Sequence, residues 1–344
     1  MSTSAQPRLS LNPTVPHEPR VVRVDQTLLE TAVARLLGDR FGDSRQGVRQ
    51  FLAGAKRSGI DLSLMWASVH SDTDAHDGQP GEVCLLVPGG GRTGMMFSST
   101  GDASPNAHIH RVAVLQAAVE FARTNLARHV RLVQSLPDPS DTPTRAALTA
   151  AGFVWVGDLM YLKRRLKRNE PDAPSSWPSG ITVRAVRTLE PGSADRADLS
   201  TAMNTSYIET LDCPELCGLR ETHDVIDSHR GARPWEPGTW WIVHDHGTPS
   251  GCMLLNVCPD HDTVDLVYLG LGPALRGRGL GSHLLRMGIS VASRSGMGSM
   301  TCAVDRRNVP AIRMYERLGF SMWSERVALV RPIESPSDAA PIAS

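Results

Sequence analysis

The chain has no excess of charge of either sign. Its 344 residues include 36 Lys and Arg and 36 Asp and Glu, so the basic surface that a nucleic-acid partner needs is not indicated. It also has no apolar run of membrane-spanning length, and residues 1–20 are polar, without the apolar core of a secretory signal. We therefore expect a soluble, cytoplasmic protein that binds neither nucleic acid nor membranes.

Cysteines at metal-ligand spacing are also scarce, because the six cysteines are scattered along the chain. Cys213 and Cys217, followed by His223 and His229, are compatible with zinc but lack the tight pairing at a turn that zinc sites usually have. The alternative is a loop with free thiols, and we predict no metal site. A hydrophobic content of 41% over this length predicts two domains with cores of their own.

A basic, glycine-rich loop organises the C-terminal half. It follows an apolar segment, Val264 to Leu271, that predicts a buried strand, and it precedes leucines at helical spacing. The first N–H groups of a helix have no internal partner, and glycines let a pyrophosphate approach them. The residues that we expect to hold such a group are Arg276, Gly277, Arg278, Gly279, Leu280, Gly281 and Ser282.

Three phosphate-binding motifs can be compared with this loop. A Rossmann fingerprint needs G-x-G-x-x-G with an acidic residue about 20 positions later, and a Walker A loop needs Gly-Lys-Ser/Thr. The chain has neither pattern here. It matches R-x-x-G-x-G at Arg276, Gly279 and Gly281.

A second motif follows at residues 308–320, which read NVPAIRMYERLGF. Pro310 and Gly319 stand where helices tolerate an early proline and end on a glycine. Asn308 and Tyr315 are seven residues, about two turns, apart, so they share one face of this helix. The loop and this helix together resemble the GNAT superfamily of N-acetyltransferases, which use acetyl-coenzyme A (acetyl-CoA).

The resemblance implies an α/β (α+β) fold with mixed, mostly antiparallel twisted sheets flanked by helices. The order of predicted elements before residue 165 repeats the order after residue 181, so we expect two GNAT-like domains. The expected organisation is a disordered tail (1–20), a degenerate GNAT-like domain (21–165), a linker (166–180), a catalytic GNAT domain (181–332) and a second disordered tail (333–344).

The first half lacks the phosphate loop. Residues 101–108, GDASPNAH, contain no arginine and no paired glycines, which suits a pyrophosphate poorly. We expect this half to be a scaffold or one wall of the acceptor site. A triple glycine at 89–91 predicts a tight hairpin turn between two strands rather than a phosphate loop.

The resemblance also implies roles for single residues. The strand before the loop should splay from its neighbour, so that backbone groups of Leu269 and Leu271 bind the pantetheine arm and the thioester. Asn308 should hydrogen-bond coenzyme A, cap its helix, or do both. Tyr315 should protonate the departing thiolate, unless its role is purely structural.

The general base has several candidates. Asp265 lies four residues before Leu269 and is expected on the same strand face. Alternatively, Asp265 is only solvated, and the base is Glu215, His261 or ordered water. Residues 207–217 should line the acceptor cleft, and their acids (Glu209, Asp212 and Glu215) would either suit a cationic amine or form a solvated face.

The resemblance therefore implies an acyltransferase. Acetyl-CoA would donate an acetyl group directly, in a ternary complex, to a primary amine of a small-molecule or peptide acceptor. The alternative from another class is a coenzyme A-binding sensor or interaction module that has lost catalysis, and a remoter one is a nucleotide-binding protein. Only the enzyme needs Tyr315 and an open acceptor cleft; the sequence identifies neither the acceptor nor the oligomeric state.

Overall fold

The computed structural model describes residues 19–38, 44–69, 80–168, 170–171, 176–231 and 235–333. In these residues eight α-helices flank one twelve-stranded mixed sheet, which confirms the predicted α/β class. Residues 1–18 and 334–344 of the predicted tails, and 169 and 172–175 of the predicted linker, lie outside the described residues. No helix in the described parts of the chain combines the length and the apolar character needed to cross a bilayer.

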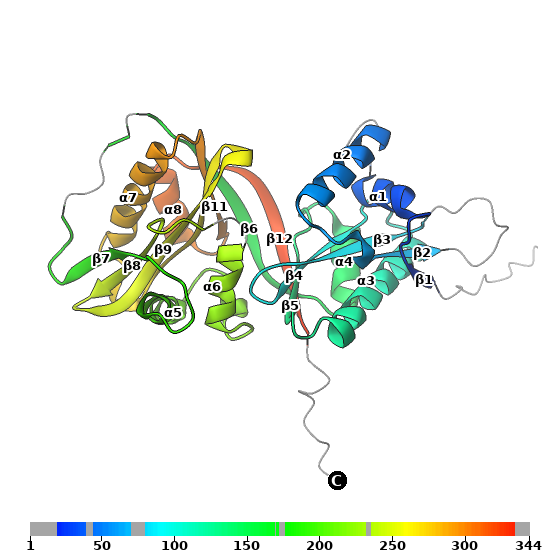
Figure 1. Ribbon diagram of the computed structural model, residues 1–344, viewed down its shortest axis with the longest axis horizontal. Helices are drawn as coiled ribbons and strands as arrows, with labels where there is room; N and C mark the ends of the chain where they lie inside the picture. Colours follow the sequence, from blue (N-terminus) through cyan, green and yellow to red (C-terminus); the bar gives the residue numbers. More distant parts are fainter. Residues whose placement is uncertain are drawn as a thin grey trace, which may run out of the picture.

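The same order of elements occurs twice along the chain (Figure 1). The first run is β1 (Arg20–Arg23), α1 (Leu29–Leu37), α2 (Ser44–Arg57), β2 (Met65–Val69), β3 (Val83–Pro88), β4 (Thr93–Ser98), α3 (Pro105–Asn125), β5 (Leu132–Ser135), α4 (Thr142–Ala150) and β6 (Val154–Arg165). The second run is β7 (Ile181–Ala185), α5 (Ala194–Tyr207), α6 (Thr222–Gly231), β8 (Trp240–Asp245), β9 (Thr248–Cys258), β10 (Thr263–Leu271), α7 (Leu280–Arg294), β11 (Ser299–Asp305), α8 (Val309–Arg317) and β12 (Ser321–Pro332).

The last strand of each run is exchanged between the two halves. The strand order is β1-β2-β3-β4-β5-β12-β6-β11-β10-β9-β8-β7. Strand β6 pairs with β11, and β12 pairs with β5, while β6 and β12 pair with each other. In Figure 1 these two long strands lie side by side between the halves. The apolar spacing of the sequence predicts strands at residues 154–162 and 327–331, but it does not predict that each completes the sheet of the other half.

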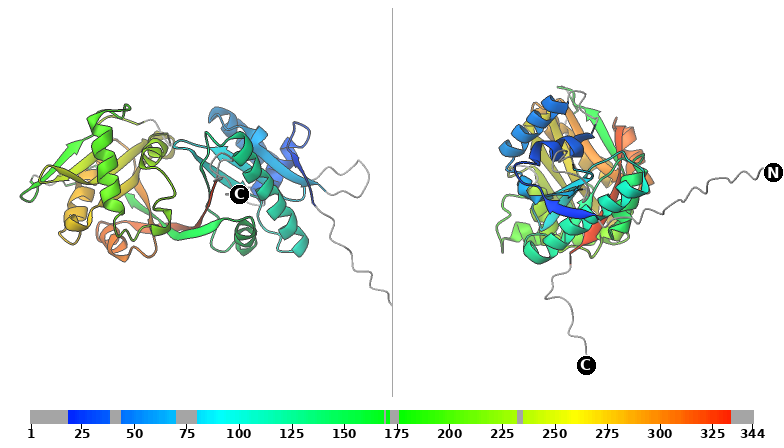
Figure 2. Two further views of the ribbon diagram at one scale, coloured as in Figure 1. Left: turned by 90° about the horizontal axis from the view of Figure 1, so that it is seen from below. Right: turned by 90° about the vertical axis from the view of Figure 1, so that its right-hand side faces the viewer.

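Helices cover both faces of the sheet in each half. In the C-terminal half α7 and α8 pack on one face, around Leu266, Leu284 and Phe320, while α5 and α6 pack on the other, around Leu199 and Trp240. The N-terminal half repeats this arrangement, with α3 and α4 on one face and α1 and α2 on the other. Figure 2 shows the two layered halves from below. Each half therefore buries its own apolar side chains, as the hydrophobic content predicts.

The triple glycine forms the predicted β3–β4 hairpin turn, and it docks on helix α6 of the other half. A Cβ atom on Gly91 would lie 1.7 Å from the carbonyl oxygen of Asp224, and one on Gly90 would lie 2.9 Å from that of Asp227. The next residue, Arg92, pairs with the mostly buried Asp224 carboxylate at 2.6 Å. Glycine is needed here because the two backbones touch, so the hairpin holds α6 in place.

Candidate active site

Strand β10 separates from β11 half-way along its length. The two strands are paired in parallel from Thr263 to Leu266, opposite Ser299 to Cys302. Beyond Leu266, β10 has no strand partner on that side among the described residues, although its pairing with β9 continues to Leu271. The backbone of the second half of β10 is therefore open on one side, as the sequence predicts for a splayed strand.

The open side carries the backbone groups of Leu269 and Leu271. The N–H of Gly272 donates to the carbonyl of Ser250 on β9 at 2.7 Å. Because neighbouring residues of an antiparallel strand point their hydrogen-bonding groups to opposite sides, Gly270 also faces β9, and Leu269 and Leu271 face away from it. The backbone groups of both residues thus point toward the gap, where the Leu271 carbonyl already accepts from the Arg276 guanidinium at 2.9 Å.

Glycines shape the loop that follows β10. Gly277 and Gly279 have φ angles of 73° and 77°, a region that other residues enter only at a cost. Gly279 is the N-cap of α7 and has no side chain to bond the first N–H groups of that helix. Gly281 lies where α7 meets α8, and a Cβ there would lie 3.2 Å from Met314 Sδ. The N-terminus of α7 is consequently uncapped, as an anion-binding helix end must be.

The two loop arginines have different partners. The Arg276 guanidinium donates to the carbonyls of Leu271, Ser206 and Glu209 at 2.9, 2.9 and 3.0 Å. It therefore joins the end of β10 to the segment after α5, a role that the sequence did not predict. Arg278 is exposed and makes one long bond to the carbonyl of Ala274, which leaves its charge at the surface of the loop.

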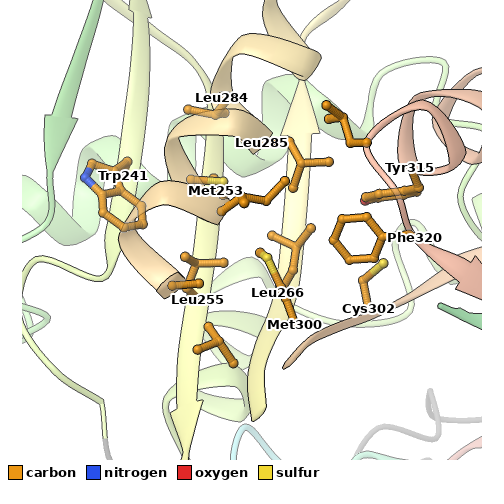
Figure 3. Close-up of a cluster of buried hydrophobic side chains, with 14 of the residues drawn as sticks. Trp241, Met253, Leu255, Leu266, Leu284, Leu285, Met300, Cys302, Tyr315 and Phe320 are labelled. Atoms are coloured by element: carbon orange, nitrogen blue, oxygen red, sulfur yellow. The ribbon is translucent and has the colours of Figure 1, made fainter. Parts of the chain in front are cut away.

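Tyr315 lies in the core that α7 and α8 form with the sheet. Figure 3 shows its ring beside Phe320, with Cys302 close by; the Tyr315 and Phe320 centroids are 5.5 Å apart. Its hydroxyl makes no hydrogen bond with another described residue, and burial raises the pKa of this phenol well above its ordinary value. The hydroxyl is therefore protonated at neutral pH. Asn308 caps α8, where its side chain accepts from the Ala311 N–H at 3.3 Å.

Asp265 does not lie on the expected face of β10. The pairing with β9 shifts register between Leu266 and Tyr268, so Val267 is a bulge. Asp265 pairs with Asn256, whereas Leu269 pairs with Met253, and these β9 residues face opposite sides of the sheet. The expectation that Asp265 shares the face of Leu269 is thus wrong, because one extra residue reverses the alternation. Asp265 faces α5 and α6 instead.

Both carboxylate oxygens of Asp265 are occupied. Oδ1 accepts from the hydroxyls of Thr263 and Thr301, and Oδ2 accepts from the Cys258 thiol at 3.1 Å. Together these bonds connect β9, β10 and β11 just before β10 and β11 separate.

The model of the acetyltransferase (GNAT) family matches residues 206–320. A mycothiol acetyltransferase of Mycolicibacterium paratuberculosis is 33% identical over 205 residues, which cover 55% of this chain but only 61% of that protein. Another from Thermomonospora curvata is 30% identical over 296 residues, which cover 84% of this chain and 87% of that protein. The chain belongs to the GNAT family of acetyltransferases.

The GNAT fold extends over nearly the whole chain. A GCN5-related N-acetyltransferase from Sphaerobacter thermophilus, 18% identical, aligns with 93% of this chain and 98% of its own, at a TM-score of 0.57. The predicted family is confirmed by the relative from Thermomonospora curvata. The shared fold and the repeated order of elements confirm the predicted tandem of two GNAT-like halves.

In the N-terminal half, backbone groups at the corresponding strand and helix end are already hydrogen-bonded to side chains. There β4 pairs with β5 only from Thr93 to Met95, but the Ser135 hydroxyl donates to the next carbonyl, that of Met96, at 2.9 Å. The first turn of α3 is capped by the Ser104 side chain. The backbone carbonyl and the helix end that are open in the second half are thus occupied in the first.

Arg307 joins the acceptor-side segment to the exchanged strand. Its guanidinium binds the carboxylates of Asp305 at 2.6 Å and Glu215 at 2.6 Å, donates to the carbonyl of Val156 on β6 and lies 4.7 Å from the Trp155 ring centre. The sequence analysis missed this residue, because its partners come from segments far apart in the chain.

The cysteine and histidine cluster considered for zinc does not assemble. Among the described residues, no three His, Cys, Asp or Glu side chains lie close enough together to hold a metal ion. Cys213 is buried, and its N–H donates to Oδ2 of Asp305 at 3.1 Å.

Proposed function

We propose that this GNAT protein is an acetyl-CoA-dependent N-acetyltransferase with its active site in the C-terminal half. The observation that carries the proposal is the open side of β10, which leads directly to the uncapped, glycine-lined N-terminus of α7. A strand edge followed by a helix end suits a ligand that has an amide-containing arm and a pyrophosphate. The relatives are acetyltransferases by name, which supports the same conclusion.

In this proposal, different groups of the chain bind different parts of acetyl-CoA. The backbone of Leu269 and Leu271 binds the pantetheine arm and polarises the thioester carbonyl. The N–H groups from Gly277 to Ser282 bind the pyrophosphate, with the charge of Arg278 beside them. Arg276 contributes its backbone and holds the loop in place, because its guanidinium is bonded to three carbonyls. Asn308 adds a polar contact at the start of α8.

The chemical step is a direct transfer in a ternary complex. The acceptor amine attacks the thioester carbon, the carbon–sulfur bond breaks, and the thiolate takes a proton from the Tyr315 hydroxyl. We propose a small-molecule primary amine as the acceptor, following the name of the relatives, which refers to mycothiol. Asp265, on the face of α5 and α6, is positioned to contact the acceptor side rather than the cofactor side.

A thiol-release assay tests this function. Acetyl-CoA is incubated with the protein and a panel of primary amines that includes the amine used by mycothiol acetyltransferases, and free coenzyme A is measured. We expect amine-dependent release, and mass spectrometry should show the acetylated amine. Binding of acetyl-CoA without release for any amine would favour the sensor, and no binding at all would reject both functions.

A further inference from the structure

We propose that Asp212 is the general base that deprotonates the acceptor amine, an inference that rests on the proposed function. Asp212 lies in the turn after α5, immediately before the short 3-10 helix Pro214–Leu216. This turn belongs to the segment expected to line the acceptor side.

The position of Asp212 is fixed by the end of β11. Its Oδ1 accepts from the backbone N–H of Asp305 at 2.7 Å, and Asp305 is completely buried. Oδ2 makes no hydrogen bond with the described residues. One carboxylate oxygen is thus anchored, and the other remains available to accept a proton.

Asp212 lies close to the gap between β10 and β11. Its charge acts on Tyr315 and Cys302, whose side chains belong to the α8 face of the sheet, and on Tyr268, which belongs to the α5 face. The Arg306 N–H donates to the carbonyl of Asp158 on β6. Because neighbouring residues of a strand point their hydrogen-bonding groups to opposite sides, the Asp305 N–H that Asp212 accepts points away from β6, toward β10. An amine that approaches the thioester from the α5 side therefore passes Asp212.

The other acids around the site are already engaged. Glu215 binds Arg307 through both oxygens, and Asp305 binds Arg307 and the Cys213 N–H. Asp265 accepts three hydrogen bonds. Each of these would have to break a bond before it could take a proton.

The electrostatic surroundings of Asp212 suit a base. The residue is exposed, but partial desolvation of its carboxyl, with the charge of Asp305, raises the carboxyl pKa above its ordinary value. The Arg307 charge and the bond from Asp305 oppose the rise. A raised pKa brings the carboxylate nearer to the basicity that proton transfer at neutral pH requires. The groups that interact with it are Asp305, Arg307, Cys213, Cys302, Tyr268 and Tyr315.

The proton balance of the step is complete. The Asp212 carboxylate takes a proton from the amine nitrogen as the nitrogen–carbon bond forms. The carbon–sulfur bond breaks, and the sulfur takes the Tyr315 proton. Both side chains then exchange protons with water, so each returns to its starting state.

The test is Asp212→Asn in the full-length protein. The amide oxygen can still accept from Asp305, so the fold and acetyl-CoA affinity, measured by calorimetry, should be unchanged. We expect kcat/KM for the amine to fall by roughly 10²- to 10⁴-fold, the usual range for one acid–base group. The wild-type decline in kcat/KM at low pH, where the base is protonated, should disappear. Glu190→Gln, which changes an exposed acid of the same half outside the acceptor-side segment, is the control.

The outcomes separate this inference from the function on which it rests. If the wild type acetylates an amine and the Asp212→Asn variant has the same activity and the same pH profile, the base assignment alone is overturned. Absence of turnover in the wild type with every amine overturns both. If Asp212→Asn does not fold, Asp212→Glu provides the test. This variant should retain partial activity, and the decline of its kcat/KM at low pH should occur at a shifted pH. Wild-type activity and an unshifted pH profile of Asp212→Glu would contradict the proposal.

Discussion

At the scale of single residues, the buried hydroxyl of Tyr315 is the group whose surroundings best fit a proton donor. It is held in the core by Phe320 and is unbonded to other described residues. Burial, more than the nearby Cys302 and Asp212, raises its pKa. A phenol that keeps its proton at neutral pH can give it to a departing thiolate, which a charged phenolate could not.

Tyr315→Phe removes this proton donor and keeps the packing of the ring. We expect turnover to fall by roughly 10²- to 10⁴-fold, with little change in acetyl-CoA affinity, because the proton moves only in the transition state. Steady-state kinetics and calorimetry measure the two effects separately. A variant with wild-type turnover, under conditions where chemistry limits the rate, would exclude Tyr315 as the acid.

At the scale of secondary-structure elements, the two ends of α7 offer a matched comparison. Gly279 begins the helix with φ 77°, and Gly296 follows its end with φ 82°; a Cβ on either would meet no atom within 4 Å. Any residue other than glycine should therefore strain both positions to a similar extent, about 1–2 kcal/mol. Only the N-terminal end should bind a pyrophosphate.

Gly279→Asp should abolish acetyl-CoA binding, because it puts a carboxylate where the pyrophosphate is proposed to lie. Gly296→Asp should destabilise the protein about as much and bind acetyl-CoA normally. Thermal denaturation measures the stability of both variants, and calorimetry measures their affinity for acetyl-CoA. Equal acetyl-CoA affinities would contradict the placement of the cofactor.

The sequence predicted most elements, because their apolar spacing is regular. The sequence predicts a helix at about residues 142–150, and helix α4 has these bounds, Thr142–Ala150. Helix α6, THDVIDSHRG, was missed, since Val225 and Ile226 are its only large apolar residues and they are adjacent. The bulge at Val267 was also missed, because a bulge depends on the partner strand rather than on the sequence of one strand. The roles of the predicted site residues stay predictions.

At the scale of the whole molecule, the halves are joined by the exchanged strands and by the glycine hairpin on α6. Neither junction could be predicted from periodicity, which says which segments are strands but not which strands pair. The predicted family and fold class did not depend on these junctions, and both are confirmed.

Gly91→Ala tests the hairpin junction, since its Cβ would overlap the carbonyl oxygen of Asp224. Gly59→Ala is the control, because Gly59 has a similar φ of 65° with no atom within 4 Å of its Cβ. We expect Gly91→Ala to lower the unfolding temperature more than Gly59→Ala does. If α6 borders the acceptor site, Gly91→Ala should also raise KM for the amine. Equal stabilities would show that the contact at Gly91 adjusts freely.

The bonded backbone groups of the N-terminal half predict one coenzyme A per chain. The Met96 carbonyl and the first turn of α3 are already bonded to Ser135 and Ser104, so a second coenzyme A would have to compete with these side chains. Titration calorimetry with coenzyme A should give a stoichiometry of one. Two sites of similar affinity would contradict this interpretation.

The exchange of β6 and β12 also governs when the protein can fold during synthesis. The N-terminal half needs β12, residues 321–332, to cover the edge of β5. Those residues form the last strand of the described residues, so the nascent N-terminal half keeps an unpaired strand edge while the second half is translated. Neither sheet can therefore be completed before β12 has been made. A ribosome that stalls before β12 would release a chain in which neither half is finished.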